Sequence, residues 1–124
     1  MRRQVADQLI IAAAAAIICF TCLGGAALWD EDEPLYASCA WEMLQRNDWV
    51  VPYYNGEMFP DKPPLMFWMM MAGYEIFGRT EFAVRVWSAL AALGTALATY
   101  HLGRLLFRRE VGLWAGLIVC SSFI

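Results

Sequence analysis

Hydrophobic residues gather in three runs along the chain, and polar residues concentrate between these runs and at their ends. Residues 9–29 contain no charged side chain, and a helix of that length is about 31 Å long, enough to cross one hydrocarbon core. Residues 82–103 form a second run, whose many small residues suit close packing against other membrane helices. Residues 111–124 form a third run that is short for a span. The pattern predicts two transmembrane helices and a truncated third.

A cleaved signal peptide is the alternative interpretation of the first run. Gly25 and Ala27 are small residues of the kind that suit a cleavage site. The run is longer than the apolar core of about 7–15 residues that is usual in signal peptides, and this length favours a retained transmembrane helix.

The segment between the two long runs, residues 30–81, begins with a predicted helix. Asp32 can cap this helix, with Glu33 and Pro34 in its first turn, where acidic residues and proline are both favoured. Apolar residues then recur at helical spacing until the polar residues 46–48 end the pattern.

A tight turn and a second helix follow. Residues 49–54 are typical of an extended segment, and the Asn-Gly pair at 55–56 is typical of a tight turn. The Pro-Pro pair at 63–64 opens a helix that reaches Phe77, with Gly78 just after its end. The apolar run of this helix is too short to cross a bilayer, so we expect the helix to lie along the membrane surface.

Composition places the chain in a membrane. Apolar residues make up 60% of its 124 residues and charged residues 17%, which is more apolar surface than one water-surrounded core of this size can bury. The net charge of −3, without a basic stripe, argues against nucleic-acid binding. The four cysteines and the single histidine, His101, predict no zinc site, and we expect the cysteines to be small apolar packing residues.

Charge also predicts the orientation in the membrane. Residues 30–81 hold ten acidic and three basic residues, whereas arginines cluster in residues 1–8 and 104–110. The positive-inside rule therefore predicts that residues 1–8 and 104–110 are cytoplasmic and that residues 30–81 form an external loop.

Four consecutive carboxylates, residues 30–33, follow the first transmembrane run. They are either an ordinary solvated anionic boundary or a cluster that binds an acceptor or a divalent metal. In the second case, one carboxylate would act as a general base.

Two cations of the loop region are further candidates. Lys62 is the only lysine in the chain and lies between Asp61 and Pro63, directly before the helix expected along the membrane. It either receives a lipid phosphate or anchors the loop by snorkelling. Arg85 lies near the outer end of the second run, where we expect it to snorkel or to form a structural ion pair with an acid of the loop.

Several of these residues belong to short motifs that follow one another in a specific order. In chain order the motifs are Asp32-Glu33-x-x-Tyr36, Asp48-Trp49-x-x-Pro52, Asn55-Gly56, Lys62-Pro63-Pro64, Trp68, Phe77-Gly78 and Arg85. This series resembles the N-terminal part of the membrane glycosyltransferase family that includes the aminoarabinose transferases acting on lipid A and, more distantly, the protein O-mannosyltransferases.

The resemblance implies an all-α integral membrane protein of GT-C type, with two juxtamembrane helices of the first external loop over the active site. Such enzymes transfer a sugar, with inversion, from a polyprenyl-phosphate donor to an acceptor on the outer side. Asp32 matches the family's catalytic aspartate and Glu33 its acidic neighbour, so the resemblance implies that both are catalytic residues. Lys62 matches the lysine that contacts the donor phosphate, and Tyr36 the tyrosine near it. A divalent metal at Asp32 is compatible with this chemistry, but the sequence does not identify one.

Leu35 stands where the aminoarabinose transferases carry an arginine, so the resemblance does not specify their sugar or acceptor. Family members are several hundred residues long and use a further acidic residue from a later external loop. We therefore expect the N-terminal part of a bacterial inner-membrane or plasma-membrane glycosyltransferase, inactive alone, whose acceptor is a lipid, protein or glycan. The alternative is a small non-catalytic membrane subunit with an acidic external docking loop.

Overall fold

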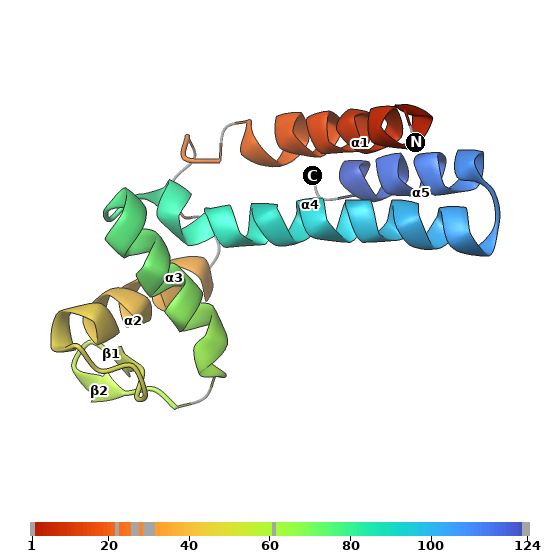
Figure 1. The fold of residues 1–124 in the computed structure, drawn as a ribbon. Helices are drawn as coiled ribbons and strands as arrows, with labels where there is room; N and C mark the ends of the chain where they lie inside the picture. Colours follow the sequence, from red (N-terminus) through yellow and green to blue (C-terminus); the bar gives the residue numbers. More distant parts are fainter. Residues whose placement is uncertain (1, 22, 26–27, 29–31, 61, 123–124) are drawn as a thin grey trace. The chain divides into compact units, whose positions relative to one another are not determined.

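The computed structural model describes residues 2–21, 23–25, 28, 32–60 and 62–122, which form five helices and one small hairpin (Figure 1). In chain order these are α1 (Arg2–Phe20), α2 (Asp32–Arg46), β1 (Tyr53–Tyr54), β2 (Glu57–Met58), α3 (Pro64–Phe77), α4 (Glu81–Leu106) and α5 (Arg109–Ser121). Among the described helices, Arg3–Phe20 of α1 and the whole of α4 are long and apolar enough to cross a membrane. The chain divides into two compact units, Met1–Thr21 with Ser88–Ile124, and Cys22–Trp87.

The first unit packs α1, α5 and the C-terminal part of α4 side by side (Figure 1). Ile11 and Ala15 of α1 meet Ala96 and Tyr100 of α4 and Cys120 of α5, and all five are buried. Alanine at these positions brings the helix backbones close together, which is how helices associate in a membrane that gives them no hydrophobic driving force.

Glycines set the closest approach between α4 and α5. A Cβ atom built on Gly112 would lie 2.6 Å from the carbonyl oxygen of Tyr100. A Cβ atom on Gly103 would lie 2.8 Å from the Cα atom of Gly112. Because these neighbours are backbone atoms, only glycine allows the two helices to cross at this distance.

A polar cluster joins the three helices of the first unit. The carboxylate of Asp7 is buried and accepts hydrogen bonds from Nε and Nη2 of Arg109, each at 2.6 Å, and from the Tyr100 hydroxyl at 3.0 Å. At the next residue of each helix, Nε2 of Gln8 lies 2.8 Å from Nε2 of His101. Each buried polar group of the cluster thus has a partner from another helix, as burial away from water requires.

The two residues of α1 in this cluster, Asp7 and Gln8, lie before the uncharged run. Helix α1 runs from Arg2 to Phe20, whereas the uncharged run predicted a span over residues 9–29. The charge pattern predicts that Asp7 and Gln8 precede the helix, but both lie within α1 and pair with residues of α4 and α5.

The second unit is built around the contact between α2 and α3 (Figure 1). Its core consists of Ala37, Cys39, Ala40, Met43, Phe67, Met70, Met71, Tyr74, Ala83 and Val84. The hydroxyl of Tyr74 donates to the carbonyl oxygen of Ala37 at 3.1 Å, which ties the two helices together. Burial raises the pKa of the Cys39 thiol to about 11, in keeping with an apolar packing role.

A two-strand antiparallel hairpin follows α2. The two turn residues, Asn55 and Gly56, have φ values of 52° and 84°, which is the backbone that a two-residue turn with an Asn-Gly pair adopts. The carboxylate of Glu42 accepts both turn N–H groups, at 2.7 Å and 3.1 Å. The predicted turn is therefore present, and α2 holds it in place.

Candidate functional site

Asp32 is the first residue of α2 and is exposed. Glu33 follows it in the first turn, where carboxylates are stabilised by the partial positive charge of the helix end. The neighbouring acids Asp30 and Glu31 lie outside the described residues. Among the residues that the structure does describe, no group of three His, Cys, Asp or Glu side chains could hold a metal ion. A metal at Asp32 would need other donors and stays a prediction.

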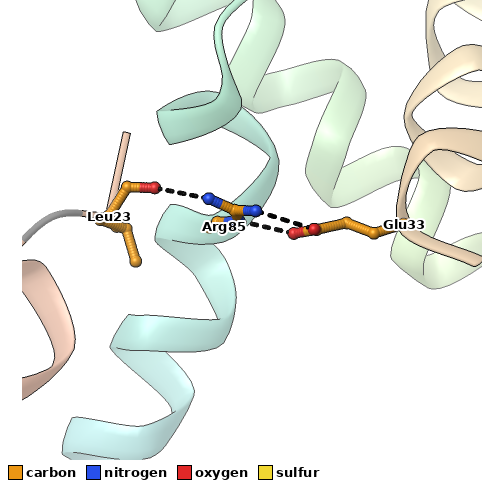
Figure 2. Close-up of polar contacts among 3 residues, drawn as sticks. All are labelled: Leu23, Glu33 and Arg85. Atoms are coloured by element: carbon orange, nitrogen blue, oxygen red, sulfur yellow. Dashed lines mark hydrogen bonds and ion pairs between the residues drawn. The ribbon is translucent and has the colours of Figure 1, made fainter. Parts of the chain in front are cut away.

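Glu33 and Arg85 form a bidentate ion pair (Figure 2). Nε of Arg85 lies 2.6 Å from Oε1 of Glu33, and Nη2 lies 2.8 Å from Oε2. Nη1 of the same guanidinium donates to the carbonyl oxygen of Leu23 at 3.2 Å. Arg85 thus connects the first turn of α2, the beginning of α4 and the segment that follows α1. The sequence predicted that Arg85 could pair with an acid of the loop but did not identify that acid. The structure identifies it as Glu33.

Lys62 lies beside Tyr36. Its ammonium nitrogen is 5.6 Å from the centroid of the Tyr36 ring, within the range of a cation–π contact. The Tyr36 ring packs edge-to-face on Phe67, with 6.0 Å between centroids. A ring of α2 that rests on α3 therefore positions the lysine that precedes α3.

The first turn and the second turn of α2 place these groups in one region. Asp32 and Tyr36 are four residues apart, and side chains at that spacing lie on the same face of a helix. The face that carries the exposed carboxylate of Asp32 therefore also carries the ring that contacts Lys62. A carboxylate and an ammonium ion in one region can remove a proton and stabilise an anion, respectively.

Local hydrogen bonds fix the segment between α2 and α3. The indole N–H of Trp68 donates to the carbonyl oxygen of Trp49 at 2.5 Å. The Asp48 carboxylate accepts the backbone N–H groups of Val50 and Val51, at 2.9 Å and 3.1 Å. These two N–H groups hold the pKa of Asp48 below its ordinary value of 3.8.

Sequence reasoning missed one cation of this unit, Arg79. Its guanidinium lies 5.0 Å from the centroid of the Trp41 ring, and Trp41 packs edge-to-face on Tyr74 at 5.7 Å. Arg79 belongs to no motif in the sequence, and only the fold brings it to Trp41, 38 positions earlier in the chain.

Residues 61–124 match the protein family described as dolichyl-phosphate-mannose-protein mannosyltransferase. Among curated proteins, an uncharacterized protein of Aquifex aeolicus is 36% identical over 117 residues, 94% of this chain and 23% of that protein. The undecaprenyl phosphate-alpha-4-amino-4-deoxy-L-arabinose arabinosyl transferase of Serratia proteamaculans is 38% identical over 100 residues, 81% of this chain and 18% of that protein. Its namesake from Yersinia enterocolitica is 41% identical over 98 residues, 78% of this chain and 18% of that protein.

Two solved structures are similar to the chain. The apo structure of ArnT from Cupriavidus metallidurans matches with a TM-score of 0.81 and 31% identity, over 90% of this chain and 21% of that one. The structure of the same protein bound to undecaprenyl phosphate matches with a TM-score of 0.81 and 28% identity, over 92% and 22%. These similarities confirm the predicted membrane fold and the predicted resemblance. The chain spans only about a fifth of the length of these relatives.

Proposed function

Because the chain belongs to the dolichyl-phosphate-mannose-protein mannosyltransferase family, we propose that it is the N-terminal part of an integral-membrane glycosyltransferase. The enzyme transfers a sugar, with inversion, from a polyprenyl-phosphate donor to a lipid, protein or glycan acceptor at the outer face of the membrane. Undecaprenyl phosphate occurs in the names of the Serratia and Yersinia relatives and is bound in one ArnT structure, which supports such a donor. The chain spans about a fifth of the length of these relatives, and we propose that it is inactive on its own.

The contact between Lys62 and Tyr36 is the observation that carries this proposal. Cleavage of a sugar–phosphate bond leaves negative charge on the departing phosphate, and a fixed cation stabilises that charge. Lys62 supplies the cation, and the ring of Tyr36 limits the directions in which its flexible stem can point. The two residues therefore form the donor-phosphate site.

Asp32 supplies the second requirement of the reaction, a base for the acceptor hydroxyl. Its carboxylate is exposed at the start of α2, on the face that carries Tyr36, and can accept a proton without first breaking an ion pair to a described residue. In an inverting transfer the acceptor attacks the sugar carbon from the side opposite the phosphate. Asp32 orients that hydroxyl and takes its proton as the new bond forms, while Lys62 holds the departing phosphate.

Glu33 has a different role from Asp32, although both are carboxylates of the first turn. Its two oxygens are engaged by Arg85, so it is poorly placed to take a proton. We assign Glu33 as a positioning residue that fixes the start of α2, and with it the backbone of Asp32.

The proposed topology follows the charge distribution. Residues 1–8 and 104–110 are cytoplasmic, residues 9–29 and 82–103 lie in the spanning regions, residues 30–81 are external, and residues 111–124 begin a third span. The membrane is a bacterial inner or plasma membrane, as the bacterial relatives suggest.

The proposal is tested by sugar transfer with the full-length protein in membranes, with a polyprenyl-phosphate sugar as donor. Asp32→Asn should lower kcat by about 10²–10⁴-fold, the usual contribution of a general base. Lys62→Ala should lower kcat/KM for the donor, because Lys62 both contacts the donor phosphate and stabilises the charge that is left on it. Glu57→Gln is the matched control, because Glu57 is an exposed carboxylate of the hairpin. If Asp32→Asn and Lys62→Ala both transfer sugar like Glu57→Gln, the proposed site is wrong.

A further inference from the structure

A cavity of about 240 Å³ lies between α2, the end of α3 and the start of α4. Its walls include Ser38 of α2, Tyr74 of α3, Arg79 and Thr80 of the connection, and Glu81 and Val84 of α4. The cavity is smaller than the roughly 300–1,000 Å³ pockets that enclose drug-sized ligands. Its size suits one small polar group rather than a whole sugar–lipid donor.

The cavity is separate from the proposed donor site. Successive residues of an α-helix are about 100° apart around its axis. Pro34 and Ser38, which line the cavity, therefore lie on the side of α2 opposite Asp32 and Tyr36. The groups assigned to sugar transfer therefore do not line this cavity, and its function is not explained by the proposed donor site.

The positively charged side chain of Arg79 lines one wall of the cavity. The guanidinium of Arg79 lies over the Trp41 ring, which packs on Tyr74, whose hydroxyl is bound to the backbone of α2. The contact with the Trp41 ring restrains the position of the guanidinium, and the five N–H donors of a guanidinium lie along its edges. Such an edge offers paired donors to a phosphate.

An acid and two hydroxyls complete the polar lining. Glu81, the first residue of α4, brings a carboxylate to the same cavity as Arg79. Neither residue forms a salt bridge with any other residue that the structure describes. The Thr80 hydroxyl accepts the Ala83 N–H at 3.2 Å and can still donate its own proton, and Ser38 adds a second hydroxyl.

The position of the cavity along α4 indicates where its ligand comes from. A helix of 26 residues is about 39 Å long and exceeds the hydrocarbon thickness of about 30 Å, so its ends reach the headgroup region. Glu81 is at one of those ends. Phosphate and ammonium groups of phospholipids are the most abundant charged groups at that depth.

We propose that this cavity binds the headgroup of an aminophospholipid, with the phosphate on Arg79 and the primary ammonium on Glu81. The opposite charges of these residues match the two charges of a phosphoethanolamine group, and the hydroxyls of Ser38 and Thr80 bind the remaining oxygens. Val84 and Leu28 belong to the apolar part of the wall and lie beside the glycerol end of the lipid. The bound lipid anchors the junction of α2, α3 and α4 to the membrane.

Native mass spectrometry of the full-length protein in detergent tests the proposal. Phosphatidylethanolamine, phosphatidylcholine and phosphatidylglycerol with identical acyl chains are titrated separately. Phosphatidylethanolamine should bind most tightly, because the quaternary ammonium of phosphatidylcholine cannot donate to Glu81 and phosphatidylglycerol has no ammonium. Arg79→Gln should weaken its binding about tenfold, as expected for the loss of a charge-assisted hydrogen bond. Glu81→Gln should remove the preference over phosphatidylcholine.

Matched controls separate this site from general lipid adhesion. Arg46 also stacks on an aromatic ring, that of Tyr53 at 4.3 Å, but lies away from the cavity, so Arg46→Gln should bind as the wild type does. Ser38→Phe fills the cavity without changing a charge and should also abolish the preference. Equal binding of the three lipids, or equal behaviour of Arg79→Gln and Arg46→Gln, would overturn the proposal. Because lipid binding is measured without sugar transfer, this proposal can fail or hold independently of the proposed enzyme activity.

Discussion

Glu33 and Arg85 are 52 positions apart in the chain, yet both carboxylate oxygens of Glu33 lie within 2.8 Å of the Arg85 guanidinium. The side chains are 26% and 20% exposed, respectively, so the pair is shielded from most of the solvent. An Arg–carboxylate fork restricts direction as well as distance. It therefore sets how the first turn of α2, which begins with Asp32, lies against the start of α4.

The first prediction concerns this ion pair. Arg85→Ala should destabilise the protein by about 1.5–3 kcal/mol, the usual loss for hydrogen bonds to a charged group. In the full-length enzyme it should lower kcat while the KM for the donor stays close to wild type, because Asp32 is displaced and Lys62 is untouched. Thermal unfolding and steady-state kinetics check the two parts.

The exchanged pair, Glu33→Arg with Arg85→Glu, is the control for that prediction. It restores the opposite charges and should recover part of the stability that either single change removes. An Arg85→Ala enzyme with unchanged kcat and a raised donor KM would instead mean that Arg85 contacts the donor directly.

The second prediction separates the ring of Tyr36 from its hydroxyl. Tyr36→Phe keeps the ring face under Lys62 and should leave the donor KM nearly unchanged. Tyr36→Ala removes a cation–π contact of about 0.5–1 kcal/mol and should raise the donor KM by about two- to fivefold. Kinetics at varied donor concentration measure both. Tyr54→Ala is the control, because Tyr54 is an exposed tyrosine of the hairpin. An equal rise of the donor KM in Tyr36→Phe and Tyr36→Ala would show that the hydroxyl, and not the ring, is the important group.

Local signals in the sequence were sufficient to predict most helix ends and the turn of the second unit. Turns and helix ends depend on a few neighbouring residues, so the Asn-Gly pair predicted the hairpin turn and Pro64 and Gly78 predicted the ends of α3. The motif order also pointed to Lys62 and Tyr36, which the structure brings together.

Long-range pairs could not be predicted in the same way. Asp7 is a polar residue near the N-terminus in the sequence, and only the fold brings Arg109 to it from 102 positions away. The same applies to Glu33, whose sequence neighbours suggested a catalytic acid but whose partner lies on another helix. Charge counting describes a residue by its surroundings in the chain, whereas the energy of a buried charge depends on its surroundings in space.

The third prediction concerns the pH dependence of stability through Asp48. Two backbone N–H groups hold the folded-state pKa of this carboxyl below its ordinary value of 3.8. The ionised group therefore stabilises the fold above pH 3.8, and this stabilisation is lost as the pH falls through the lower folded-state pKa. Asp48→Asn keeps an oxygen acceptor but cannot titrate. The difference in Tm between pH 6 and about pH 3 should be smaller in this variant than in the wild type; identical pH profiles would show that Asp48 does not contribute.

The fourth prediction tests the crossing of α4 and α5. Gly112→Ala would place a Cβ atom 2.6 Å from the Tyr100 carbonyl oxygen and 2.8 Å from the Arg104 nitrogen, and backbone atoms cannot move aside as a flexible side chain can. The helices must separate, which also disturbs the contact of Tyr100 with the buried Asp7. Gly94→Ala is the matched control on α4, since a Cβ atom there meets nothing within 4 Å. Alanine is favoured over glycine inside a helix by about 1 kcal/mol, so Gly94→Ala should hold or raise the Tm in detergent while Gly112→Ala lowers it. If both variants unfold at the same temperature, the close approach of these helices does not stabilise the unit.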